Sequence, residues 1–138
     1  MKPFVIFLPL FLLMYTITAQ TRLNDNISDT DITPEVVVNR QLEAYNSRNI
    51  EQFVATYSEN IEIYKDGKLI MKGREQLRER YDALFKNTPN LHCFIENRIL
   101  INNKVIDKEN VKTNDRFIEA VAIYEVADGK IQKVTFVE

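Results

Sequence analysis

Apolar residues recur at helical spacing in three stretches of the chain, 34–46, 50–57 and 74–86. In the first stretch Val38, Leu42 and Tyr45 fall on one face, and the other two show the same period. Thr33 precedes the first stretch, and its hydroxyl can accept from the free N–H groups of a first helical turn. The pattern therefore predicts three helices, the second of them short.

The remaining apolar stretches alternate with period two, which is typical of strands. Residues 61–64 and 69–71 flank a turn at 65–68 and predict a hairpin. Beyond residue 90 the chain is rich in β-branched and aromatic residues, with turn signals at Asn102-Asn103, Thr113-Asn114 and Asp128-Gly129. These signals predict a four-stranded antiparallel meander over 91–101, 104–113, 115–126 and 131–138.

The N-terminal segment has a different character. Lys2 precedes an almost wholly apolar run, 4–15, and small residues follow it. This pattern predicts a signal peptide over 1–19, because the run is too short to span a bilayer. Residues 20–32 are polar and acidic and are interpreted as a flexible leader, which leaves one domain at 33–138. We therefore expect a secreted or periplasmic protein with no membrane span after cleavage.

Composition narrows the functional classes. The formal net charge is −2, which disfavours a nucleic-acid partner. Cys93 is the single cysteine, so no intramolecular disulfide can form. His92 is the single histidine, and no acidic or cysteine residues surround it at ligand spacing, so no metal site or other cofactor is expected.

Several short sequence segments occur in a characteristic order: 42–49, 53–58, Gly73 ahead of 77–81, and 123–126 ahead of 129–131. Together they resemble the nuclear transport factor 2-like superfamily, in its SnoaL-like and ketosteroid-isomerase-like branch, over 34–138. The resemblance implies an α+β fold in which three helices wrap a cone-shaped, curved antiparallel sheet, hairpin plus meander, around one apolar pocket. The superfamily includes isomerases, cyclases, dehydratases and binding proteins, so the fold alone does not fix the function.

The catalytic positions of the resembled enzymes are occupied by other residue types here. Bacterial ketosteroid isomerases use a carboxylate base, a tyrosine and a protonated aspartic acid. In this sequence Lys65 stands near the position of the base, Gln41 at that of the tyrosine and Ala122 at that of the aspartic acid. None of the three can perform the matching role. The acid that SnoaL-like cyclases carry in the same late strand is also missing, since Ala122-Ile123 precedes Tyr124-Glu125.

Strand pairing predicts which side chains share the pocket face. A two-residue turn at Asn102-Asn103 sets Arg98 opposite Asp107 and Glu96 opposite Glu109. A turn over 113–116 sets Asp107 opposite Ala122 and Glu109 opposite Ala120. By the same alternation we expect His92, Phe94 and Leu100 on this face and Cys93 on the other.

Asp107 is the best candidate for chemistry, because two small alanines leave space beside it. The alternatives are that Asp107 only forms an ion pair with Arg98 and that Glu109 is solvated near the sheet edge. For His92 the alternative is a strand-end residue in ordinary hydrogen bonds, and for the aromatic residues it is filling of the core. The candidate ligand-binding residues are Tyr57, Tyr81, Phe85, His92, Arg98, Glu109, Ala122, Tyr124 and Phe136.

Two functions fit these residues. The first is binding of a small, largely apolar molecule whose polar end is fixed by Arg98, Asp107 or a tyrosine hydroxyl. The second is an isomerase, cyclase or dehydratase acting on a small apolar carbonyl compound, with Asp107 as proton acceptor. A pocket filled by its own aromatic side chains, leaving a structural role, is the third alternative.

The other sheet face is also informative, because a sheet with one face on the core normally presents polar residues to water on its second face. Here that face is largely aliphatic, which predicts a homodimer that pairs sheet to sheet. Coverage by the leader or by a helix of the same chain is the alternative. The expected contact residues are Ile95, Ile99, Ile101, Phe117, Val121, Ile123 and Val137.

Overall fold

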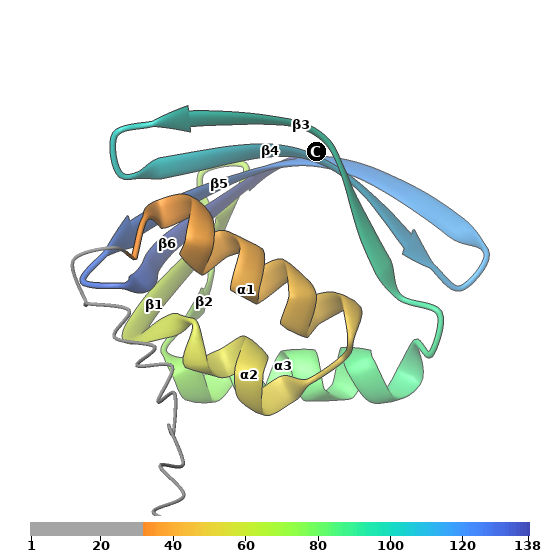
Figure 1. The fold of residues 1–138 in the computed structure, drawn as a ribbon. Helices are drawn as coiled ribbons and strands as arrows, with labels where there is room; N and C mark the ends of the chain where they lie inside the picture. Colours follow the sequence, from red (N-terminus) through yellow and green to blue (C-terminus); the bar gives the residue numbers. More distant parts are fainter. Residues whose placement is uncertain (1–31) are drawn as a thin grey trace, which may run out of the picture.

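The computed structural model describes residues 32–138. The predicted signal peptide and all but the last residue of the predicted leader lie outside these residues. Three helices and six strands follow one another in the described part of the chain (Figure 1). The helices are α1 (Pro34–Asn46), α2 (Ile50–Ala55) and α3 (Arg74–Asn87), and the strands are β1 (Tyr57–Lys65), β2 (Lys68–Lys72), β3 (His92–Ile101), β4 (Lys104–Thr113), β5 (Arg116–Ala127) and β6 (Lys130–Val137).

The strands form one curved, unclosed sheet in the order β2-β1-β6-β5-β4-β3, and the helices lie on its concave side (Figure 1). The predicted α+β fold with three helices against a hairpin and a four-stranded meander is confirmed. One pairing differs from the expected antiparallel sheet, because β1 and β6 run parallel. The chain between them contains β2, α3 and the strands β3 to β5, and a connection of that length can join strands in either direction.

The predicted helix starts are confirmed at the level of single hydrogen bonds. The side chain of Thr33 accepts from the backbone N–H of Val36, and that of Asn49 accepts from Gln52. Gly73 stands ahead of α3 with φ at 87°, a conformation that suits glycine. Its N–H donates to the carbonyl of Ile61, which ties the start of α3 to β1. The second helix ends earlier than predicted, since Tyr57 already begins β1.

Aromatic rings pack where the three helices meet the sheet. Phe53 is fully buried and lies against Tyr57, Tyr81 and Phe85 at centroid distances of 5.0, 4.6 and 5.4 Å. Tyr45 of α1 completes the group. This cluster fixes α2 and α3 against β1, and it fills one end of the space under the sheet.

The predicted register of the meander is confirmed around Asp107. Arg98 pairs with Asp107 across β3 and β4, and Asp107 and Glu109 pair with Ala122 and Ala120 across β4 and β5. The expected pairing of Glu96 with Glu109 is wrong. A β-bulge between Ile95 and Asn97 leaves Glu96 without a partner position, so Ile95 pairs with Glu109 instead.

The bulge inverts the start of β3, because one extra residue exchanges the two faces of a strand. Cys93, expected on the outer face, is buried on the inner one. His92 and Phe94, expected on the pocket face, lie on the outer face, where their rings are 4.4 Å apart. Ile95, expected among the contact residues of the outer face, likewise faces inward.

The three helices described within residues 32–138 include none with the length and apolar character of a membrane span.

Candidate functional site

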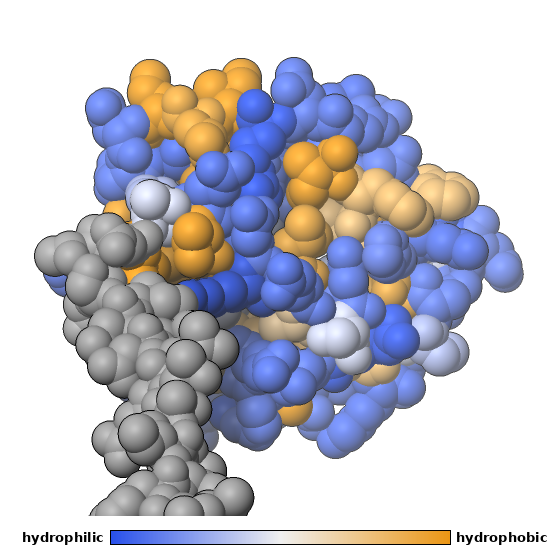
Figure 2. Space-filling view, in the orientation of Figure 1, coloured by the Kyte–Doolittle hydropathy of each residue, from blue (hydrophilic) through white to orange (hydrophobic). Residues whose placement is uncertain are grey.

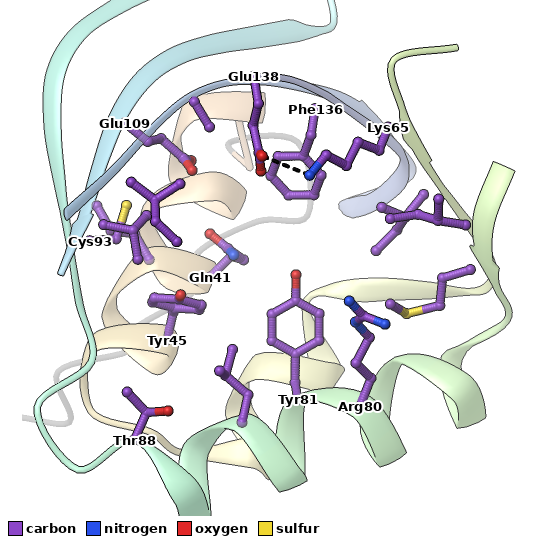
Figure 3. Close-up of a pocket in the computed structure, with 18 of the residues that line it drawn as sticks. Gln41, Tyr45, Lys65, Arg80, Tyr81, Thr88, Cys93, Glu109, Phe136 and Glu138 are labelled. Atoms are coloured by element: carbon purple, nitrogen blue, oxygen red, sulfur yellow. Dashed lines mark hydrogen bonds and ion pairs between the residues drawn. The ribbon is translucent and has the colours of Figure 1, made fainter. Parts of the chain in front are cut away.

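A cavity of about 550 Å³ lies between the concave face of the sheet and helices α1 and α3 (Figure 3). All six strands contribute side chains to it. Its volume is in the range of small-molecule sites, and its walls are mainly apolar. The lining residues are Gln41, Leu42, Tyr45, Ile63, Lys65, Ile70, Met71, Arg80, Tyr81, Ala83, Leu84, Asn87, Thr88, Cys93, Glu109, Val111, Ile118, Ala120, Tyr124, Phe136 and Glu138.

The structure brings some of the predicted site residues together and separates others. Those that line the cavity are Tyr81, Glu109, Tyr124 and Phe136. The residues Tyr57, Phe85 and Ala122 are buried in the core and do not line it. Arg98, Asp107 and His92 also lie outside the lining, the first two as an ion pair and the third on the outer face.

Glu109 is the buried carboxyl group among the residues that line the cavity. It lies on the inner face of β4, is only 6% exposed, and accepts a hydrogen bond of 2.7 Å from the Tyr124 hydroxyl. Burial raises the pKa of Glu109 to about 7, the Tyr124 hydrogen bond partly lowers it, and the nearby Asp107 charge raises it. A carboxyl group with this pKa can donate or accept a proton near neutral pH.

Asp107 is two residues earlier on the same face of β4, yet it is chemically occupied. Its two carboxylate oxygens accept from Nε and Nη2 of Arg98 at 2.6 and 2.7 Å. The side chain of Asp107 is 1% exposed and that of Arg98 is 15% exposed. Asn39 accepts a further hydrogen bond from Arg98. This geometry matches the structural alternative for Asp107, in which the carboxylate balances a guanidinium beside the cavity.

Polar side chains on the helix side complete the inner wall. Gln41 of α1 is buried and donates to the Tyr57 hydroxyl at 3.0 Å. Tyr81 of α3 lies across the cavity from Gln41 in Figure 3, and burial raises its pKa to about 12. Burial likewise raises the pKa of Tyr124, so both tyrosines keep their protons at neutral pH and can donate hydrogen bonds.

Cys93 lines the same wall as Glu109. Burial raises the pKa of its thiol, and the Glu109 and Asp107 charges raise it further. The thiol is thus protonated at neutral pH and is a poor nucleophile. Within residues 32–138 no three His, Cys, Asp or Glu side chains are grouped so as to hold a metal ion.

Sequence reasoning left several lining residues out of the site. Gln41 and Lys65 stood at positions that the resembled isomerases use for catalysis, so a signal for both was available. Cys93 was missed because the bulge at Glu96 changes its face. Arg80 has no sequence signal beyond its place three residues after Leu77 on the predicted third helix.

Comparisons with solved structures agree with the fold. A cystatin-fold protein from Novosphingobium aromaticivorans matches with a TM-score of 0.71 and 20% identity, over 77% of this chain and 98% of that one. A putative ketosteroid isomerase from Kribbella flavida matches with a TM-score of 0.65 and 18% identity, over 75% and 76% of the two chains.

A putative polyketide cyclase from Sinorhizobium meliloti matches with a TM-score of 0.64 and 13% identity, over 72% of this chain and 92% of that one. At these identities the likeness concerns the fold alone. A comparison with curated proteins found no match. The profile of SnoaL-like domains, however, matches residues 38–134, which is most of the chain. The chain therefore belongs to the family of SnoaL-like domains.

Proposed function

We propose that the protein binds a small, largely apolar molecule in the cavity under its sheet, with a polar group of that molecule hydrogen-bonded to Glu109. The observation that carries this proposal is the cavity itself, about 550 Å³ with mainly apolar walls and one buried carboxyl group. A single precisely placed polar group in an apolar cavity fixes the orientation of a ligand. The aromatic cluster around Phe53 leaves this volume free, which supports a role with a ligand.

The probe for this proposal is β-naphthol, a flat apolar molecule with one hydroxyl group. We expect saturable binding in a fluorescence titration and weaker binding of naphthalene, because only the phenol can donate to Glu109. Ala120→Phe places a ring in the cavity and should abolish binding. Ala127→Phe on the same strand, at an exposed position, is the matched control. Unchanged binding in Ala120→Phe contradicts the proposal.

A second candidate function is proton transfer next to a carbonyl group, as in isomerases, cyclases and dehydratases. A carboxyl group with a pKa of about 7 favours it, since a general base works best near the ambient pH. The proton acceptor in this version is Glu109 and not Asp107, because Arg98 holds both oxygens of Asp107.

Deuterium exchange at the acidic carbon of β-tetralone tests this second function by NMR. Catalysed exchange should rise as the pH passes 7 and should vanish in Glu109→Gln. Exchange that persists in Glu109→Gln, or no exchange above buffer, rejects it and leaves binding as the function.

The quaternary structure belongs to the same proposal, as a homodimer formed through the outer face of the sheet. Phe94, Ile99, Ile101, Phe117 and Val137 lie exposed on that face, Phe117 by 63%. Figure 2 shows hydrophobic side chains gathered over the β3–β4 hairpin. Pairing of two copies would remove this surface from water.

Light scattering at tens of micromolar tests the dimer. We expect twice the monomer mass for the native sequence and a monomer for Phe117→Lys, while Leu69→Lys, exposed on β2, should remain dimeric. A native monomer contradicts the proposal.

We place this function outside the cytoplasm, in the periplasm or the medium, after removal of residues 1–19. The support is the charge of Lys2 followed by the apolar run at 4–15. Intact-mass measurement of the protein in cell fractions tests this, since a full-length cytoplasmic protein contradicts it.

A further inference from the structure

Two cationic side chains border the cavity on the side away from Glu109. Lys65, on β1, follows the buried residues Ile61 and Ile63 at period two and so faces inward. Arg80 lies on α3 beside Tyr81 and is exposed. Figure 3 shows both directed into the cavity on one side, with Glu109 and Cys93 on the other.

The distance between the two sides follows from the strand order. Glu109 is on β4 and Lys65 on β1, with β5 and β6 between them. Three steps of about 4.8 Å separate these strands by roughly 14 Å. Glu109 is buried and Arg80 is exposed, so the cavity runs from a deep carboxyl group to a cationic rim.

The cations at the rim are weakly engaged by the protein. Among residues 32–138, Lys65 has one carboxylate partner, Glu138 at 2.6 Å, with the two side chains 42% and 40% exposed. An exposed pair of this kind contributes little to stability and exchanges readily. Arg80 has no carboxylate within 4.0 Å among residues 32–138. The Arg80 charge lowers the pKa of the neighbouring Tyr81, although burial raises that pKa by more.

We propose that Lys65 and Arg80 form a specificity site for an anionic group, so that the ligand is an amphipathic acid with its carboxylate at the rim, its apolar body in the cavity and a hydroxyl group at its far end on Glu109. The inference rests on the proposed binding function and names its ligand class. Charge-assisted hydrogen bonds from an ammonium and a guanidinium to one carboxylate are stronger than those between neutral groups. The carboxylate would take the place of Glu138 on Lys65.

12-Hydroxydodecanoic acid and 1,12-dodecanediol are the matched probes, because their chains are equally long, each carries a hydroxyl group for Glu109, and only one carries a charge. We expect calorimetric titration to show the acid binding about tenfold more tightly, the ratio expected from a net gain of about one charge-assisted hydrogen bond. The preference should shrink at high salt, while binding of the diol should not weaken.

Variants locate the effect. Lys65→Met with Arg80→Met should reduce the acid to the affinity of the diol, and Lys68→Met, an exposed lysine outside the cavity, should leave the ratio unchanged. Glu138→Gln removes the internal competitor for Lys65 and should strengthen binding of the acid while leaving the diol alone. This gain does not depend on a destabilised variant.

The outcomes separate the two proposals. Equal affinity of acid and diol, or a preference that survives the double substitution, overturns the anionic site and leaves the binding function standing. If neither dodecyl compound binds but β-naphthol does, the ligand class is wrong and the cavity function remains. If none of the three binds, both proposals fail.

Discussion

Asp107 and Glu109 are two carboxyl groups on the same face of the same strand, and they have opposite characters. Both are almost fully buried, at 1% and 6% exposure. Both carboxylate oxygens of Asp107 accept hydrogen bonds from the Arg98 guanidinium. Glu109 accepts one hydrogen bond from the Tyr124 hydroxyl and otherwise borders an apolar cavity. Burial alone therefore does not decide the role of an acid on this strand. The partner decides it, because a full countercharge offsets the cost of desolvation and a hydroxyl does so only in part.

The largest expected effect comes from removing the countercharge. Arg98→Met leaves the Asp107 carboxylate buried without its partner and should lower the free energy of unfolding by about 3 kcal/mol at neutral pH. Urea unfolding measures it. Arg78→Met is the matched control, since it breaks only the exposed pair with Glu51 and should cost about 1 kcal/mol or less.

The double variant Arg98→Met with Asp107→Leu sharpens this result. The double variant should lose less unfolding free energy than the sum of the losses in the two single variants, because neither charge is then left unpaired. Additive losses would show that the two groups do not act as a pair.

A smaller effect is expected from pH and concerns Glu109. Its pKa is about 7 in the folded protein and about 4.3 when unfolded, so the folded state binds more protons between these values. Protonated Glu109 makes its full contribution to the free energy of unfolding below pH 4, and this contribution is lost as the pH rises through 7. One pKa unit corresponds to about 1.4 kcal/mol, so the upper limit for the fall over that window is about 4 kcal/mol. Because Glu109 borders a cavity that solvent can enter, the measured fall should stay below the loss in Arg98→Met.

Glu109→Gln tests this pH effect, because an amide does not titrate. The difference in unfolding free energy between native protein and variant, followed from pH 4.5 to 8, should show the fall in the native protein only. Parallel profiles for the two proteins would mean that Glu109 titrates with an ordinary pKa.

The smallest effect concerns the hydroxyl partner of Glu109. The Tyr124 hydrogen bond lowers the pKa of Glu109, so Tyr124→Phe should raise that pKa above 7, by up to about 1, which corresponds to one hydrogen bond. Carboxyl ¹³C shifts followed against pH would measure it. A pKa that stays at its native value would indicate that the hydroxyl has no influence on the charge of Glu109.

Much of this comparison was readable from the sequence. The two-residue turn at Asn102-Asn103 fixed the pairing of Arg98 with Asp107, and the next turn placed Asp107 and Glu109 opposite alanines. Turn length sets register over the residues nearest the turn, so these predictions were correct there. The expected pairing failed at Glu96 and towards the start of β3. A bulge there adds one residue to the strand, and the alternation of apolar and polar residues in the sequence does not reveal it.

The sequence by itself determined the element order, the helix caps and the register beside each turn, since all of these depend on residues close together in the chain. Only the tertiary structure decided which of two neighbouring acids faces the cavity and which one is neutralised. The pKa of Glu109 is raised to about 7 because α1, α3 and the neighbouring strands bury its carboxyl group, and no cation among residues 32–138 forms an ion pair with it. The rim cations likewise come from β1 and α3, and only the closure of the helices under the sheet brings Lys65 and Arg80 to one cavity.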